Sequence, residues 1–227
     1  MSLNVNYIYS ASQNIINSNQ TGNFKPILFN AYAPMAVVDI FSKYAHEYQA
    51  TQQISDALYP FIHRVQLSQI PNTTAQFAYP SANGLQYVNL MALRYRIPNG
   101  NGGFTELPVQ ILTDDELGRR LQSPVVAPST TINAPPVATQ YDTYVQLYPE
   151  TISTIVMVYL RQPVTPYWNY TIVNGLPVYT ATGSTDFEFN WKQQNELIIR
   201  ICQYFGVYVR DQEVIQVTEA LKQQQIV

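Results

Sequence analysis

The residues best suited to chemistry are few and widely spaced. The chain has two histidines, His46 and His63, and a single cysteine, Cys202. The pair His46-Glu47 resembles the start of a helical zinc motif, but position 50, where a second histidine is needed, holds Ala50. We therefore interpret His46 as a surface or interface residue. Cys202 falls in an apolar helical pattern, which is typical of a buried and inert thiol.

Two carboxylates lie two positions apart. Asp186 and Glu188 fall in an expected strand over residues 185–189, where residues i and i+2 share a face. A pair of this kind can bind a cation or act in a glycosidase, so a hydrolase is one hypothesis. A solvated strand face is the commoner use of such a pair.

Phosphate chemistry has little support. The glycine-rich segment 98–103 is not followed by Lys-Ser or by a helix start. Arg94, Arg96, Arg119 and Arg120 could contact phosphates, but in a chain of net charge −3 without a Lys/Arg run we expect them to pair with carboxylates. The sequence thus predicts no enzyme, no cofactor and no metal site.

The composition points to protein contacts. Charged residues make up 12% of the chain, against about 25% in an average soluble domain, while 22 glutamines, 17 asparagines and 18 tyrosines supply the polarity. Amides and phenols suit wet protein interfaces. The first 25 residues lack a basic segment followed by an apolar run, so we expect no signal peptide. The longest apolar runs are too short to span a bilayer, so we expect no membrane contact.

Many tyrosines fall in the middle of the chain. They could form a stacking platform for carbohydrate or bases, or serve in sheet cores and subunit contacts, which is the commoner use. They are Tyr79, Tyr87, Tyr95, Tyr141, Tyr144, Tyr148, Tyr167, Tyr170 and Tyr179.

The elements that must position these residues follow from periodicity and turn residues. We expect a short helix over residues 7–17, a helix over 35–53 that begins after Pro34 and resumes over 54–59, and either a strand or a helix end over 61–70. Alternating and β-branched runs predict further strands. These strands cover residues 85–97, 105–112, 141–148, 151–161, 167–173 and 176–180, the last two joined by a type I′ turn at Asn174-Gly175.

A capping box starts one helix. Thr113 and Glu116 can satisfy each other's backbone amides, and the acids Asp114, Asp115 and Glu116 suit the positive end of the helix dipole. A helix over 114–122 follows. Residues 123–137 are proline-rich and uncharged, which predicts an extended arm.

Two helices are expected to close the chain. Asn190 is the expected cap of the first and Gly206 its end, while Asp211 caps the second. The first has one apolar stripe formed by Trp191, Ile198, Ile201, Cys202 and Phe205.

The order of elements is α+β: a helical N-terminal region, a central antiparallel β-rich body, an extended proline-rich arm and two closing helices. We divide the chain into an N-terminal arm over 1–34, a helical and hairpin part over 35–122, the arm over 123–137 and a β-rich part over 138–227. Residues 35–227 are expected to form one composite domain.

Two stretches carry a family resemblance. The first runs from Leu107 to Pro136 and includes Asp114-Asp115-Glu116 and Ser123-Pro124. The second contains Val158-Tyr159-Leu160-Arg161-Gln162-Pro163, Pro166-Tyr167-Trp168 and Ser184-Thr185-Asp186-Phe187-Glu188-Phe189. Over residues 107–211 the chain resembles small virion proteins of crAss-like tailed phages that infect gut Bacteroidetes. It departs from their pattern at Phe189-Asn190-Trp191, where a tryptophan is expected directly after Phe-Glu.

The resemblance implies a structural role. Such proteins form the head-to-tail connector or the neck and tail rings, so it implies a homo-oligomeric ring, dodecameric by resemblance, in the virion. Its partners would be the portal and other ring proteins, and DNA would pass nearby without sequence-specific binding. The uncharged arm and the N-terminal 34 residues would clasp neighbours. The alternatives are a soluble carbohydrate- or protein-binding tail module and a hydrolase that uses Asp186 and Glu188.

Overall fold

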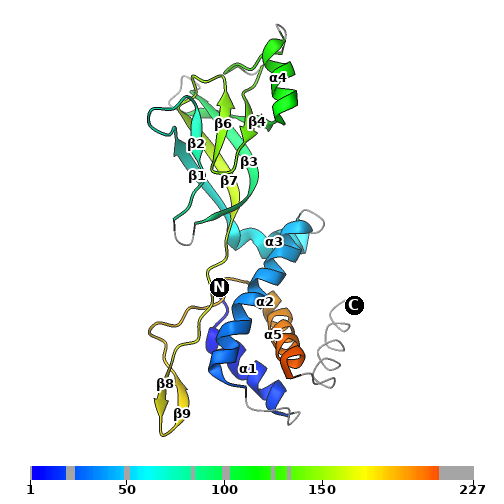
Figure 1. Cartoon of the computed structure of the whole chain (residues 1–227), viewed down its shortest axis with the longest axis vertical. Helices are drawn as coiled ribbons and strands as arrows, with labels where there is room; N and C mark the ends of the chain where they lie inside the picture. The colour runs from blue at the N-terminus through cyan, green and yellow to red at the C-terminus, as the bar shows by residue number, and fades with distance from the viewer. Residues whose placement is uncertain are drawn as a thin grey trace. The chain divides into compact units, whose positions relative to one another are not determined.

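The computed structural model divides the chain into two compact units (Figure 1). It describes residues 2–18, 24–48, 52–82, 85–98, 103–123, 126–131 and 134–209. A helical unit combines Met1–Pro60 with Pro163–Val227, and a β unit, Phe61–Gln162, is inserted between these two segments. The α+β class expected from the sequence is confirmed. The boundaries after Pro60 and before Pro163 differ from the sequence-based division, which kept residues 35–227 in one domain.

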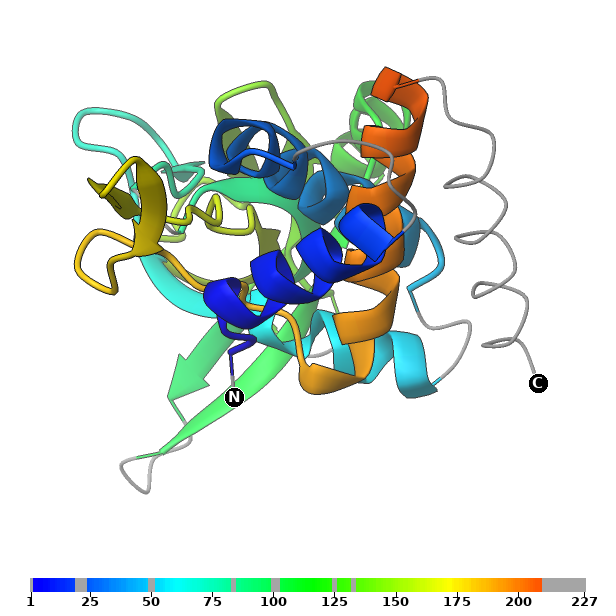
Figure 2. The same ribbon diagram turned by 90° about the horizontal axis from the view of Figure 1, so that it is seen from below.

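The helical unit is built from both ends of the chain. Its closing helix α5 packs against α1 and α2 (Figure 2). Its elements are α1 (Val5–Ser18), α2 (Pro26–His46), α3 (Gln52–Leu58), the hairpin strands β8 (Tyr170–Val173) and β9 (Leu176–Tyr179), the 3₁₀ turn η2 (Trp191–Gln193) and α5 (Gln194–Val209).

Helix α1 confirms the helix expected over 7–17, but the N-terminal region is no arm. Asn4 caps the helix, because its Oδ1 accepts the Tyr7 amide at 3.1 Å. Val5, Ile8 and Ile16 are fully buried on one face. The described part of residues 1–34 therefore packs in its own chain and is not left extended to clasp a neighbour.

Helix α2 starts earlier than expected. Pro26 occupies its first turn, and Pro34, the expected start, lies inside it. A proline in a helix interior costs about 3 kcal/mol, because a hydrogen bond is lost and the ring crowds the preceding turn. Burial of Phe29, Ile40 and other apolar residues of α2 offsets that cost.

The β unit is a curled seven-stranded sheet with strand order β1-β7-β3-β4-β5-β6-β2. All strand pairs are antiparallel except β4 with β5. The 3₁₀ turn η1 (Tyr59–Phe61) spans the boundary with the helical unit. The elements of the β unit are β1 (Ile62–Ser68), β2 (Gln76–Ala78), β3 (Tyr87–Pro98), β4 (Phe104–Ile111), α4 (Asp114–Gln122), β5 (Val137–Gln140), β6 (Tyr144–Tyr148) and β7 (Thr154–Arg161).

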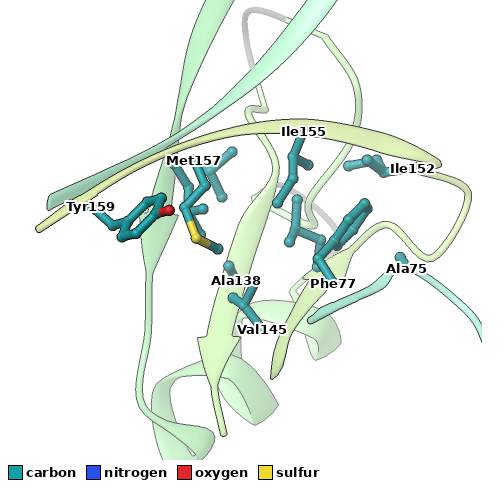
Figure 3. Close-up of a cluster of buried hydrophobic side chains, with 11 residues drawn as sticks. Ala75, Phe77, Ala138, Val145, Ile152, Ile155, Met157 and Tyr159 are labelled. Carbon is teal, nitrogen blue, oxygen red and sulfur yellow. The ribbon is translucent and has the colours of Figure 1, made fainter. Parts of the chain in front are cut away.

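One face of the sheet encloses the core of the β unit (Figure 3). Strand β7 contributes Ile155, Met157 and Tyr159 to it, which are spaced by two and so share one face of the strand. Val156 and Leu160, on the other face, are buried as well. Phe77 and Val145 face them from β2 and β6. The Tyr159 hydroxyl reaches the edge of this core and donates to the Leu85 carbonyl oxygen at 2.8 Å.

Several sequence predictions are confirmed in the β unit. Strands β3 and β4 form the expected hairpin, residues 61–70 contain a strand, and α4 has the expected bounds with its capping box complete. The expected arm over 123–137 ends differently, since Pro136 is buried and Val137 opens β5 inside the sheet. Strands β2 and β5 were not expected.

The closing helix was predicted with wrong ends. Asn190 makes no side-chain capping bond, Trp191 is exposed instead of lying in the apolar stripe, and Gly206 lies within α5. The second closing helix, from Asp211, and Pro124 lie outside the described residues. Residues 185–189 form isolated bridges, not a strand.

We predict that the fragment Phe61–Gln162 folds alone. All the residues of its main hydrophobic cluster lie within the fragment. Its two ends are close together, because Ile62 near the start pairs with Leu160 near the end. Circular dichroism should show a sheet that melts cooperatively. A fragment that remains unfolded in buffer would contradict the division into two units.

Candidate functional site

The most distinctive surface feature is the β8–β9 hairpin. Its turn residues Asn174 and Gly175 have φ angles of 52° and 80°, the two positive values of a type I′ turn, as predicted from the sequence. In the ladder Tyr170 pairs with Tyr179 and Val173 with Leu176. In Figures 1 and 2 the hairpin stands to the left of the helices of its unit.

The base of the hairpin is tied to two helices through Trp168. The Trp168 amide donates to Asn30 Oδ1 at 2.9 Å, and the Asn30 amide donates back to the Trp168 carbonyl oxygen at 3.0 Å. The Trp168 indole donates to Asn6 Oδ1 at 3.0 Å. One residue of the returning chain is thus bonded to both α1 and α2.

Aromatic rings complete this anchor. Trp168 is buried and stacks on Tyr9 of α1 with ring centroids 4.2 Å apart. Tyr170 and Tyr179 lie at 5.5 and 5.9 Å from the Trp168 ring. Offset aromatic pairs add to the free energy gained by burial, so the first pair of the hairpin is held firmly.

The segments that flank the hairpin are bonded to each other. Tyr167 and Thr185 exchange two backbone hydrogen bonds of 3.0 and 2.8 Å. Asn169 donates its side-chain amide to the Thr182 carbonyl oxygen at 2.8 Å. Gly183 has a φ of 82°, and a Cβ there would lie 2.9 Å from Asn169 Nδ2, so only glycine fits without strain.

The predicted carboxylate pair binds backbone amides. Asp186 Oδ1 accepts the Val5 amide at 2.8 Å, and Glu188 Oε2 accepts the Val164 amide at 2.8 Å. Asp186 therefore also places a negative charge at the start of α1, which suits the helix dipole. Between them Phe187 is fully buried and exchanges backbone hydrogen bonds with Leu3. This geometry explains both carboxylates as structural residues.

The outer face of the hairpin is apolar and exposed. Because Trp168 stacks on Tyr170 and Tyr179, alternation along the strands turns the opposite face away from the anchor. That face carries Val173, Leu176 and Val178, which are 49%, 67% and 46% exposed, and the exposed Thr171 opposite Val178. Residues 163–185 contain no charged side chain at all. We call Val173, Leu176 and Val178 the hairpin face.

The other predicted family-motif residues belong to different elements of the two units. Leu160 and Arg161 end β7, where Leu160 is buried and the Arg161 guanidinium lies 5.6 Å from the Phe61 ring centroid. Pro163 is buried where the chain re-enters the helical unit. Trp191, at 68% exposure, is the most exposed of these residues.

The acidic helix start of α4 has the expected structural role. The Thr113 amide donates to Glu116 Oε2 at 3.1 Å and the Glu116 amide to Thr113 Oγ1 at 3.4 Å. Asp114 accepts a hydrogen bond from the Tyr141 hydroxyl at 3.3 Å, and Asp115 is exposed in the same turn.

The arginines of β3 pair with a carboxylate, as expected. Arg96 Nε lies 3.1 Å from Glu106 Oε1 and Arg94 Nη1 lies 3.6 Å from Glu106 Oε2. Arg64 of β1 bonds to the same carboxylate. All three side chains emerge on the sheet face opposite the core, where they are engaged with one glutamate.

The histidines and the cysteine are not gathered into a site. His63 contacts the Tyr159 ring edge-on at 5.6 Å, which fits a packing role. Cys202 is fully buried, and desolvation raises the pKa of its thiol to about 12. Across the described ranges no three His, Cys, Asp or Glu side chains come close enough to hold a metal ion. Nor does any helix in those ranges have the length and apolarity to cross a membrane.

Comparison with known proteins adds no assignment. No protein-family model matches the chain, and no curated protein matches it.

Sequence reasoning missed the partners of Trp168. Asn6 and Asn30 lie in helices with few charged residues, and nothing in their spacing points to a tryptophan more than 130 residues away. The exposed hairpin face did have a signal, which is the uncharged run 163–185.

We predict that Asn30→Ala lowers the free energy of unfolding by about 1–3 kcal/mol, because the backbone groups of Trp168 lose their partners. Chemical denaturation of the helical unit measures this. Asn14→Ala, the same exchange at an exposed site of α1, is the control and should be neutral or slightly stabilising. If both substitutions changed the free energy of unfolding equally, the Asn30–Trp168 hydrogen bonds would make no specific contribution to stability.

We predict that Cys202 resists thiol reagents in the native protein. It is fully buried and its raised pKa keeps it protonated at pH 8. Absorbance titration with a disulfide reagent should find no reactive thiol before denaturation and one thiol after it. Rapid native labelling would show that the α1–α5 contact opens readily.

Proposed function

We propose that this chain is a non-enzymatic structural subunit that assembles into a homo-oligomeric ring in the neck or tail of a tailed phage virion, around the DNA passage. The proposal joins two kinds of support. The sequence resemblance over residues 107–211 suggests a place in the virion neck or tail. The exposed apolar surface of the helical unit supports the binding of one copy to another.

The main support for the proposal is the exposed apolar surface of the hairpin face. A monomer that must stay soluble uses interspersed charges and exposes few contiguous apolar patches. Here three apolar side chains, each about half exposed or more, lie together on an uncharged hairpin whose base is rigidly anchored. A preordered apolar arm loses little entropy on binding, which suits a permanent protein contact.

The carboxylates and arginines support a structural role over a chemical one. Asp186 and Glu188 each accept a backbone amide, so both carboxylates already hold the fold together. Arg64, Arg94 and Arg96 share Glu106, so these ion pairs explain the arginines without a phosphate-binding role.

The tyrosines give the carbohydrate-binding alternative no specific support. Tyr79 stacks on Tyr87 with centroids 4.1 Å apart, and Tyr141 stacks on Tyr144 at 4.9 Å. These rings stack on one another within the β unit, which fits the packing role expected for most of the tyrosines.

We predict that the purified protein forms oligomers and that Leu176→Glu shifts them toward monomers by at least about tenfold in dissociation constant, since a charge replaces a central apolar contact. Mass photometry over a dilution series measures this. Leu121→Glu, the same exchange at an exposed leucine of α4, is the matched control and should assemble as the native protein does.

A native protein that stays monomeric at all concentrations, alone and with portal complexes, would refute the proposal. If Leu176→Glu assembles as the native protein does, the contact between copies does not involve the hairpin face.

A further inference from the structure

Strand β1 is one edge of the seven-stranded sheet of the β unit (Figure 1). It has seven residues and pairs only with β7, in one continuous register. The other edge strand, β2, has three residues. Edge strands are usually short, bulged or protected by proline or lysine, because their unpaired backbone groups can pair with another chain. Strand β1, all of which the structure describes, has none of these four devices.

The unpaired backbone groups of β1 belong to alternate residues. The register with β7 continues one residue beyond the strand, where the Gln69 amide donates to the Ser153 carbonyl oxygen at 3.0 Å. The odd-numbered residues therefore bond to β7, and the even-numbered residues direct their N–H and C=O groups away from it. These even-numbered residues are Ile62, Arg64, Gln66 and Ser68.

This outer edge is open along most of its length. The next even-numbered residue, Ile70, has a partner, because its amide donates to the Gln76 carbonyl oxygen at 2.8 Å. Before that point, no residue in the described part of the chain bonds to the outward backbone groups. No residue of β1 is buried. The edge therefore presents a row of hydrogen-bond donors and acceptors that fits an extended backbone.

One face of β1 continues the core of the β unit. Val65 and Leu67 are partly buried and pack against the core cluster. A strand added beside β1 places every second side chain next to these two residues. Apolar side chains at those positions extend the core and lose contact with water. The chemistry of this face thus selects a segment that is apolar at alternate positions.

The other face of β1 carries an excess of positive charge. Arg64 shares Glu106 with Arg94 and Arg96, so three guanidinium groups meet one carboxylate. The Arg64 side chain is still 51% exposed. Opposite charges on neighbouring strands stabilise a sheet, and like charges destabilise it. A carboxylate on the added strand is therefore favoured beside Arg64.

We propose that the outer edge of β1 binds an extended segment of another protein as an added strand, with carboxylates on the face of Arg64 and apolar side chains on the face of Val65. Backbone hydrogen bonds supply the affinity, and the alternating side chains supply the specificity. A second copy of β1 is a poor occupant, because its own Arg64 adds positive charge to the same face. The contact requires no association between copies and goes beyond the proposed function.

Titration of the whole, isotope-labelled chain with synthetic peptides tests the contact. The probe is a capped peptide of alternating valine and glutamate. One control peptide has lysine in place of glutamate, and a second has N-methyl groups in place of its backbone amide hydrogens. Nuclear magnetic resonance follows the amide signals of β1 and the hydrogen exchange of Arg64 and Gln66.

We expect the Arg64 and Gln66 amides to exchange rapidly in the free protein and to be protected when the valine–glutamate peptide binds. The lysine peptide should bind at least about fivefold more weakly, because like charges meet at Arg64. The N-methylated peptide should not bind at about 1 mM, because its donors are lost. Arg64→Gln should remove the preference for glutamate over lysine.

Four results would overturn the inference. They are protection of the Arg64 and Gln66 amides in the free protein, no shift of β1 signals by the valine–glutamate peptide at about 1 mM, equal binding of the N-methylated peptide, and an unchanged preference for glutamate in Arg64→Gln. None of them bears on the ring assembly, which the native mass of the protein tests separately.

Discussion

The helical unit depends on the bond between Asn30 and Trp168. The unit is made from two ends of the chain, and the whole β unit is inserted between them. The returning segment must therefore attach to α1 and α2 by contacts remote in sequence. Asn30 supplies both a donor and an acceptor to one backbone position, as a neighbouring strand would, and the buried indole of Trp168 adds a third bond and a stack on Tyr9. The hairpin, its exposed face and the carboxylate contacts to Val5 and Val164 all follow from that attachment.

The Asn30–Trp168 bond also shows one use of the many amide side chains in the sequence. Amides in place of charges suggest a surface used for protein contacts, yet several of them act inside one chain. Asn6 and Asn30 hold Trp168, Asn169 closes the base of the hairpin, and the buried Gln146 donates to the Thr74 carbonyl oxygen at 2.7 Å. Low charge thus has two sources here: internal amide anchors, and exposed apolar faces that carry no charge.

Sequence reasoning succeeded where the controlling residues are local. The Thr113–Glu116 capping box, the positive φ values of Asn174-Gly175 and the hairpin of β3 with β4 depend on neighbours close in the chain. It failed where distant packing outweighs local preference, as when α2 runs through Pro34 and α5 through Gly206. The inserted β unit left a signal in the sequence, since Pro60 and Pro163 mark its two boundaries. That the flanking segments form one unit follows from the contacts of α1 and α2 with the returning chain. No pattern in the nearby sequence predicted that Trp168 would bond to Asn6 and Asn30.

The most direct test of the account is a cryo-electron microscopy map of the assembled protein, alone or in the virion neck. The account predicts that residues 170–179 are ordered and buried between copies, with Val173, Leu176 and Val178 against a neighbouring subunit. A map in which the chain forms a ring but every copy leaves the hairpin face in solvent would contradict it.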